Sequence, residues 1–237
     1  MSEPLIPATV AFRPNGSPYS PLYGDIYHSV VGSVAQAQYV FLQGNGLPER
    51  WQGCPDFTVL ETGFGMGINF LTTWAAWRAD PLRGGRLHFV SVEKHPFSAS
   101  DLRLTHAATI DDAPVAALAQ TLADAWPDLT PGTHTLAFDN DITLTLIFDD
   151  AVTVLPTLQF RADAFYLDGF APAKNPELWT PSVFESLGAL ANEGATFSTY
   201  TSAGDVKRAL LHAGFQYKKI PGFGWKRAML AGKYLPL

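Results

Sequence analysis

The stretch VLETGFGMGINFLTTWAAW, from Val59 to Trp77, decides the fold, because an apolar strand pattern passes through a glycine-rich turn into a helical pattern. Its glycines, Gly63, Gly65 and Gly67, stand at alternate positions where the strand must become the helix. Glycine tolerates positive φ and lets a ligand approach the backbone, so this turn is a candidate binding loop. Tight turning alone also accounts for glycines, and both interpretations stay open at this point.

A carboxylate at the end of the strand narrows the choice of ligand. Dinucleotide-binding loops read G-x-G-x-x-G and present a helix N-terminus to a pyrophosphate. The loop here reads E-x-G-x-G-x-G, with Glu61 before the first glycine. A carboxylate at this point would repel a pyrophosphate but attract the ammonium group of S-adenosylmethionine, directly or through water. The pattern therefore favours S-adenosylmethionine over NAD.

From Phe57 onward, short apolar runs alternate with longer helical patterns, which is typical of an α/β fold with a mostly parallel sheet covered by helices. Strands are predicted at 57–61, 87–93, 163–168 and 194–200, and helices at about 68–78, 94–125, 182–191 and 202–214. Antiparallel pairs are predicted at 133–148, around Asp139-Asn140-Asp141, and at 215–234. Residues 1–56 show a helical period only near 32–42, so we expect an N-terminal extension packed on a 57–237 core and forming part of a pocket rim.

Composition bounds the class of protein. With 237 residues, 47% hydrophobic and 16% charged, the chain can bury a core of its own. One cysteine, no signal-peptide pattern and no run of about 20 apolar residues predict a cytoplasmic protein without a membrane segment. The net charge of −6 argues against a generic nucleic-acid binder, although Lys and Arg gather near the C-terminus. No cluster has metal-ligand spacing, so no metal is expected.

Further acids stand where the next strands are predicted to end. Glu93 closes the second strand, where an acid accepts hydrogen bonds from ribose hydroxyls in NAD and S-adenosylmethionine sites alike. Asp149 and Asp150 follow the 142–148 strand. A carboxylate there can accept from an adenine amine or can cap a helix that begins near Ala151, and the sequence leaves both roles open.

Asp168, at the end of the 163–168 strand, is the candidate catalytic residue. Ligands of open parallel sheets bind beyond the carboxyl ends of the strands near the switch point, so Asp168 should face the reactive end of the donor. In the loop that follows, Phe170, Lys174 and Trp179 are placed to contact a planar, anionic substrate. Plain core packing is the equally open alternative for the two aromatic residues.

Several long strings resemble one known family. ETGFGMGINFLTTW, DAFYLDGFAPAKNPELWT and FSTYTSAGDVKRALLHAGFQYKKIPGFGWKRAML are similar, in this order, to the methyltransferase half of the tRNA 5-methylaminomethyl-2-thiouridine biosynthesis bifunctional protein. GDIYHS and YVFLQGNGLPERW are similar to the N-terminal region of that half, so nearly the whole chain is covered. The resemblance implies a Rossmann-like class I methyltransferase that uses S-adenosylmethionine to methylate the primary amine of 5-aminomethyl-(2-thio)uridine at the tRNA wobble position.

The resemblance also implies roles for single residues. The glycine loop with Glu61 would hold the methionine moiety, Glu93 the ribose and Asp150 the adenine amine, and Asp168 would lie at the reacting end. The family has Gly where Asp149 stands, which favours Asp150. The family commonly has Thr where Met66 stands, and little consequence is expected. The full expected cofactor-binding set is Glu61, Thr62, Gly63, Phe64, Gly65, Gly67, Asn69, Glu93, Lys94, Asp150 and Asp168.

On the substrate side, the resemblance implies tRNA, bound through its anticodon region, as the partner. The expected contacts are Phe170, Ala171, Lys174, Lys218 and Lys219. Bifunctional members continue into an FAD-dependent oxidase, whereas no second glycine-rich dinucleotide site precedes Leu237. The chain is therefore expected to be a stand-alone member, served by a separate oxidase acting upstream, or the methyltransferase half of a longer protein. The open alternatives are an aminopropyl transferase, a small-molecule amine N-methyltransferase, an NAD-dependent reductase and a non-catalytic tRNA- or nucleotide-binding module.

Overall fold

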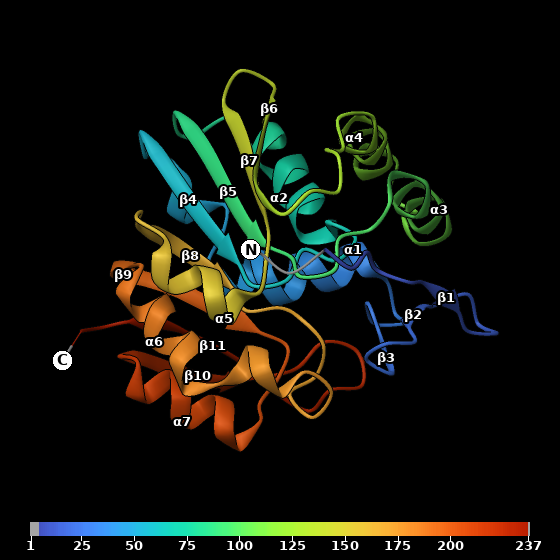
Figure 1. The fold of residues 1–237 in the computed structure, drawn as a ribbon. Helices are drawn as coiled ribbons and strands as arrows, with labels where there is room; N and C mark the ends of the chain where they lie inside the picture. Colours follow the sequence, from blue (N-terminus) through green and yellow to red (C-terminus); the bar gives the residue numbers. More distant parts are fainter. Residues whose placement is uncertain (1–4, 237) are drawn as a thin grey trace.

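A computed structural model describes residues 5–236, whose centre is an eight-stranded sheet in the order β10-β11-β9-β8-β4-β5-β7-β6 (Figure 1). The strands are β4 (Asp56–Glu61), β5 (Arg86–Val92), β6 (Gly132–Phe138), β7 (Ile142–Phe148), β8 (Ala162–Tyr166), β9 (Ala191–Thr199), β10 (Phe215–Ile220) and β11 (Met229–Tyr234). β7, β5, β4, β8 and β9 are parallel, and both edges are antiparallel through β6 and the β10–β11 hairpin. The predicted fold class is confirmed.

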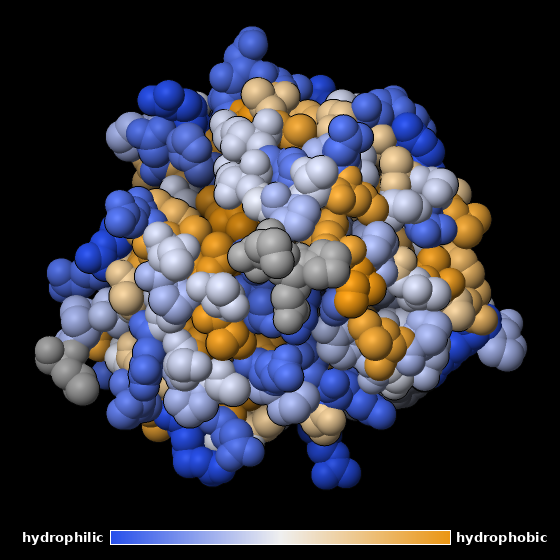
Figure 2. Space-filling view, in the orientation of Figure 1, coloured by the Kyte–Doolittle hydropathy of each residue, from blue (hydrophilic) through white to orange (hydrophobic). Residues whose placement is uncertain are grey.

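Helices cover both faces of the sheet (Figure 1). They are α1 (Ser33–Gln36), α2 (Ile68–Ala79), α3 (Ala99–Thr109), α4 (Ala113–Asp124), α5 (Ala151–Val154), α6 (Pro181–Ala189) and α7 (Gly204–His212). Neighbouring residues of one strand belong to different cores: Val59 packs in the cluster with α1, α2, α3 and α4, whereas Leu60 packs in the cluster with α5, α6 and α7. This two-sided burial explains why the parallel strands read as continuous apolar runs. In Figure 2, hydrophobic surface gathers toward the middle of the visible face.

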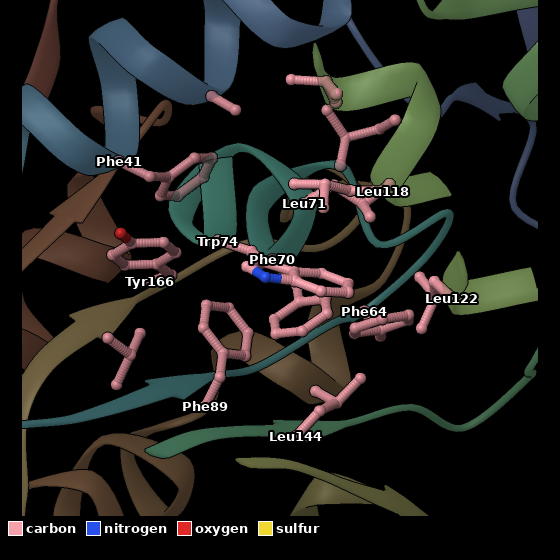
Figure 3. Close-up of a cluster of buried hydrophobic side chains, with 14 of the residues drawn as sticks. Phe41, Phe64, Phe70, Leu71, Trp74, Phe89, Leu118, Leu122, Leu144 and Tyr166 are labelled. Carbon is pink, nitrogen blue, oxygen red and sulfur yellow. The ribbon is translucent and has the colours of Figure 1, made fainter. Parts of the chain in front are cut away.

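The core under α2 is largely aromatic (Figure 3). The ring of Phe70, on α2, lies 5.3 Å from that of Phe89 on β5, and Phe89 lies 5.7 Å from Tyr166 on β8. Tyr166 in turn stacks with Phe41 at 5.3 Å. These edge and stacked contacts fix the start of α2 against the ends of β4 and β8, where the candidate site lies.

Most predicted boundaries differ from the structure by one or two residues, and larger differences occur in two places. The helical stretch predicted from 94 to 125 is two helices, because Asp112 accepts from the backbone N–H of Val115 and caps a new helix. β9 begins at Ala191, where a helix had been predicted to end. Asn192-Glu193-Gly194 has the composition of a turn, but it forms an irregularity inside β9, opposite Ala162 and Ala164 of β8.

The described residues before β4 form a small three-stranded sheet, β1 (Ala11–Phe12), β2 (Pro18–Ser20) and β3 (Asp25–Ile26), and then a helical segment. That segment runs from α1 through the π-helical stretch η1 (Ala37–Leu42) to the 3-10 turns η2 (Gln43–Asn45) and η3 (Glu49–Trp51). Buried Asn45 ties it to the sheet: its amide donates to the Phe165 carbonyl at 3.3 Å and to Ser198 Oγ at 2.7 Å, and its oxygen accepts from Thr196.

Replacing Asn45 with Ala should lower the free energy of unfolding by about 1–3 kcal/mol, because several buried polar groups lose their partner at once. Urea denaturation followed by circular dichroism measures this change. Gln43→Ala, an exposed position on the same turn, is the matched control and should unfold like the wild type. Equal unfolding midpoints for Asn45→Ala and Gln43→Ala would contradict the anchoring role of Asn45.

Candidate active site

A cavity of about 1140 Å³, counting its open mouth, lies beyond the carboxyl ends of the parallel strands. Loops after β4, β5, β7 and β8 form its floor, and the N-terminal segment forms the opposite wall. The position is the one expected for ligands of open α/β sheets, because the chain leaves β4 toward β5 on one side and returns to β8 on the other.

One amide joins two acids at the floor of the cavity. Asn69 Nδ2, in the first turn of α2, lies 2.8 Å from Glu61 Oε1 and 2.8 Å from Asp168 Oδ2. Ser91 Oγ donates to the other oxygen of Glu61 at 2.7 Å. Glu61 ends β4 and pairs with Tyr166, the last residue of the adjacent parallel strand β8, and Asp168 follows two residues later, so strand pairing itself brings the two acids together. Asp168 is therefore held in one orientation at the cavity surface.

Burial changes the acid strength of both carboxyl groups. It raises the pKa of Glu61 to about 8, which the nearby charge of Asp168 reinforces and hydrogen bonds from Ser91 and Asn69 oppose. Burial also raises the pKa of Asp168 to about 6, against the Gly169 N–H, the Asn69 amide and the charge of Lys226. The site thus disfavours two negative charges side by side and welcomes a positively charged or proton-donating ligand group.

The glycine loop lets two strand ends touch. A Cβ on Gly63 would lie 3.3 Å from the carbonyl oxygen of Asp168, so no larger residue fits there without displacing the β8 loop. Thr62 Oγ1 donates to that same carbonyl at 2.7 Å. Gly67 has φ of 71° and begins α2, and a Cβ there would lie 2.6 Å from the ring of Phe64. Gly63 and Gly65 line the cavity, whereas Gly67 shapes the turn from behind.

Acids that follow β5 and β7 line the other half of the cavity. Glu93 accepts from the backbone N–H groups of Gly65 and His95, each at 2.7 Å, which fixes both of its oxygens. Asp150 caps α5 by accepting from Val152 N at 2.9 Å. Its second oxygen lies 2.6 Å from Lys94 Nζ, and this hydrogen bond raises the pKa of Lys94. The capping role of Asp150 is thus present, and its position in the cavity wall leaves adenine binding as a further role.

An aromatic wall stands on the Asp168 side. Phe170 stacks on Tyr23 with ring centroids 4.5 Å apart and meets Tyr27 edge-on at 5.1 Å. Trp179 is buried, and its indole N–H donates to the Phe170 carbonyl at 2.9 Å. Of the two interpretations of the aromatic residues, core packing holds for Trp179, while Phe170 lines the cavity.

The structure brings most of the predicted residues together, and the exceptions have simple causes. Glu61 is fully buried behind Asn69. Ala171 and Lys174 sit just outside the lining, where the backbone N–H of Ala171 donates to Asp25. The lining residues from the predicted cofactor set are Thr62, Gly63, Phe64, Gly65, Asn69, Glu93, Lys94, Asp150 and Asp168.

Lys218 and Lys219 do not reach the cavity. Both are exposed on the edge strand β10, with Lys219 level with Leu230 of β11 and Thr199 of β9. Two strand spacings, about 10 Å, therefore separate Lys219 from β9. Adjacent strand residues also point to opposite faces, so the two lysines do not form one surface. Their contact with tRNA stays a prediction.

The sequence predicts that the N-terminal extension forms part of a pocket rim, but it points to none of the site residues there. Tyr23, Tyr27 and His28 line the cavity, as do Ser33 and Gln36. The signal was present in GDIYHS, a polar and aromatic string without helical period, but nothing in its spacing pointed to a ligand. Among the described residues, His28 Nε2 is a buried ring nitrogen without a hydrogen-bond partner, while Nδ1 lies 2.8 Å from the Ser29 carbonyl. With the proton on Nδ1, Nε2 offers the cavity an acceptor.

Comparison with known proteins places the chain in a family. Residues 113–234, more than half of the chain, match the family model described as S-adenosyl-L-methionine-dependent methyltransferase. The chain belongs to this family. Its cofactor is accordingly S-adenosylmethionine.

Similar proteins extend the comparison to the whole chain. The tRNA 5-methylaminomethyl-2-thiouridine biosynthesis bifunctional protein MnmC of Paraburkholderia phytofirmans is 68% identical over all 237 residues, and that of Paraburkholderia xenovorans is 67% identical. The chain spans 36% of the length of each of these curated relatives. The family resemblance stated from the sequence is confirmed.

Solved structures agree on the fold. The crystal structure of MnmC2 from Aquifex aeolicus matches the whole chain and 73% of its own, with a TM-score of 0.77 and 23% identity. A spermidine synthase, solved with a transition-state analogue, matches 95% of this chain and 71% of its own, with a TM-score of 0.50 and 11% identity. Within residues 5–236, no helix is long and apolar enough to cross a membrane, and no three His, Cys, Asp or Glu side chains are grouped as metal ligands.

The cavity fits S-adenosylmethionine. The unpartnered acceptor on His28 and the fixed carboxylates of Glu93 and Asp150 suit the amine and hydroxyl donors of an adenosine. The pair of Asn69 and Asp168 suits the ammonium group of its methionine part. Gly63 and Gly65 carry no side chain, which leaves room in the cavity for the amino-acid part of the ligand.

The raised pKa of Glu61 should make stability depend on pH. Below about pH 4.5 the carboxyl is protonated in both states, whereas above the folded pKa of about 8 folding must bury a charge. The free energy of unfolding should therefore fall as pH rises between these values, and Glu61→Gln should lack this share of the loss. Urea denaturation of both proteins at pH 5, 6.5 and 8 measures it. A Glu61→Gln difference that stays constant with pH would contradict a buried, protonated Glu61.

Proposed function

We propose that the chain methylates the primary amine of 5-aminomethyl-(2-thio)uridine at the wobble position of tRNA. The observation that carries this proposal is the 68% identity, over all 237 residues, to a protein named for 5-methylaminomethyl-2-thiouridine biosynthesis in tRNA. The amine acceptor is supported by Asp168, a carboxylate aimed into the cavity beside an aromatic wall that suits a pyrimidine base.

Different residues around the cavity bind different parts of the cofactor. When bound, S-adenosylmethionine supplies an electrophilic methyl group on its sulfonium sulfur. Glu93 holds the ribose hydroxyls, Asp150 and His28 hold the adenosine edge, and the backbone of the glycine loop borders the methionine part. Glu61 acts through Asn69, because it is fully buried and does not touch the cavity.

Asp168 orients the acceptor amine and stabilises the positive charge that grows on its nitrogen during transfer. An alkylammonium has no free lone pair, so the amine must first lose a proton. A carboxylate is a weak base for this task, and the proton passes to water. The carbonyl of Gly169 accepts a hydrogen bond from Tyr200, and that of Phe170 accepts one from Trp179. These two hydrogen bonds fix the loop after β8 and do not position the substrate amine.

The surroundings of the reaction follow from this substrate. The preceding step must expose a primary amine on the uridine, and an FAD-dependent oxidase, separate or fused, is the proposed source. A tRNA substrate places the protein in the cytoplasm. We further propose that residues 1–56 act as an extension of the 57–237 domain, since side chains between Ala8 and Gln36 complete the cavity wall.

Asp168→Asn should lower kcat for methyl transfer by about 100- to 1000-fold, because the charge opposite the developing ammonium is lost while the amide keeps the hydrogen bond with Asn69. The wild-type kcat/KM should fall below pH 6 as Asp168 is protonated, and the variant should lack that limb. Stopped assays across pH 5 to 9 measure both. Glu185→Gln, exposed on α6, is the control. Full turnover by Asp168→Asn would remove Asp168 from the mechanism.

The substrate itself is tested with labelled S-adenosylmethionine and tRNA from cells that lack this activity, followed by nucleoside mass analysis. The proposal expects one added methyl group on 5-aminomethyl-(2-thio)uridine and on no other nucleoside. Putrescine, offered in parallel, should gain neither methyl nor aminopropyl groups. Tight cofactor binding without transfer to any tRNA would contradict the proposal and favour a binding module.

A further inference from the structure

Trp225 is the most exposed large hydrophobic residue described, with 89% of its surface open to solvent. Four of the other tryptophans, Trp51, Trp74, Trp77 and Trp179, are buried on helices and 3-10 turns of the core, and Trp126 is partly buried. An exposed indole contributes nothing to folding and leaves a large apolar ring in water. Tryptophan is enriched at binding surfaces, so this indole is a candidate contact for a partner.

The turn that carries Trp225 is held in place on both sides. The backbone N–H of Lys226 donates to the Phe223 carbonyl at 3.2 Å, which closes a turn with Trp225 near its tip. Tyr39 fixes the start of the loop, since its hydroxyl donates to the Pro221 carbonyl at 3.0 Å and its ring lies 5.9 Å from that of Phe223. Trp225 is thus presented on an ordered turn.

This turn lies at the rim of the cavity. The β10–β11 loop lies at the carboxyl end of β9, because Leu230, near the start of β11, pairs with Thr199, the last residue of β9. After Trp225 the chain turns inward: Lys226 Nζ lies 4.2 Å from the centre of the Tyr200 ring, and the Tyr200 hydroxyl donates to the carbonyl of Gly169, next to Asp168.

On its other side the turn meets the N-terminal wall. A Cβ on Gly224 would lie 3.0 Å from Val31 Cγ2, so the two segments are in close contact. Val31 belongs to a short exposed stretch between His28 and Ser33, both of which line the cavity. Trp225 therefore lies on a turn that borders the N-terminal wall of the cavity, beside the path that the chain attached to a substrate would take.

The chemistry of the rim fits unpaired RNA better than protein. Bases of single-stranded loops stack on aromatic side chains, and cationic neighbours neutralise the adjoining phosphates. Lys226 and Arg227 follow Trp225 directly, and both are exposed. A nucleotide that inserts its base into the cavity must be splayed from its neighbours, which leaves a flanking base without its stacking partner.

We propose that Trp225 stacks on an unpaired nucleobase that flanks the nucleotide whose amine lies against Asp168. The inference rests on the proposed function, since it takes an RNA loop as the substrate. The indole replaces the stacking that the flanking base loses when its neighbour enters the cavity. Arg227 holds the adjacent phosphate.

The test compares wild type with Trp225→Ala and Trp225→Phe on a 17-nucleotide anticodon stem-loop that carries 5-aminomethyluridine at the wobble position. Loss of one base stack, about 1–3 kcal/mol, corresponds to a KM raised about 5- to 150-fold in Trp225→Ala. The kcat and the KM for S-adenosylmethionine should stay unchanged, and Trp225→Phe should keep most of the affinity. Leu82→Ala, which changes an exposed apolar residue in the loop between α2 and β5, is the control.

Two further measurements separate the possible failures. The free nucleoside 5-aminomethyluridine has no flanking base, so its KM should be equal in wild type and Trp225→Ala. Titration with an unmodified stem-loop should quench tryptophan fluorescence in wild type and less in Trp225→Phe, whether or not methyl transfer occurs. Absent transfer with intact quenching would contradict the proposed function alone. An unchanged stem-loop KM, an equal loss with the nucleoside, or a dimer that Trp225→Ala dissolves in sedimentation would overturn the stacking role.

Discussion

The hydrogen bonds of Asn69 to Glu61 and Asp168 are the interaction on which the rest of the site depends. Two carboxyl groups at the ends of adjacent parallel strands would repel each other in a buried setting. The side-chain amide of Asn69, in the first turn of α2, donates a hydrogen bond of 2.8 Å to each of them. These two hydrogen bonds hold the carboxyl groups close together. The glycine loop has to be compact for α2 to begin at that point, and the lack of a side chain on Gly63 lets the β8 loop close over it.

The cavity is asymmetric because its two halves are built from different parts of the chain. The half at Glu93 and Asp150 consists of fixed acceptors at strand ends, each held by backbone N–H groups. The half at Asp168 has an aromatic wall in which Phe170, from the β8 loop, stacks on Tyr23 from the N-terminal segment. An adenosine suits the first half, and a base that presents an amine suits the second.

The fold and the acids of the candidate site could be predicted from the sequence. Other site residues could not, for physical reasons. The acids that follow apolar runs could be predicted as site residues because the carboxyl ends of parallel strands lie at the same side of the sheet. This holds however far apart the strands are in the sequence. Tyr23 and His28 were missed because an irregular segment has no period from which to read the direction of a side chain. Lys218 and Lys219 were grouped as neighbours in sequence, but a strand sends adjacent residues to opposite faces.

The most direct test of the central claim is a crystal structure with S-adenosylhomocysteine bound. The account predicts that the amino acid end lies beside Asn69 and Asp168 and that the adenosine extends toward Glu93 and Asp150. The space between Asp168 and Phe170 should stay open for the acceptor. Electron density for the ligand in the reverse direction, or outside this cavity, would contradict the account.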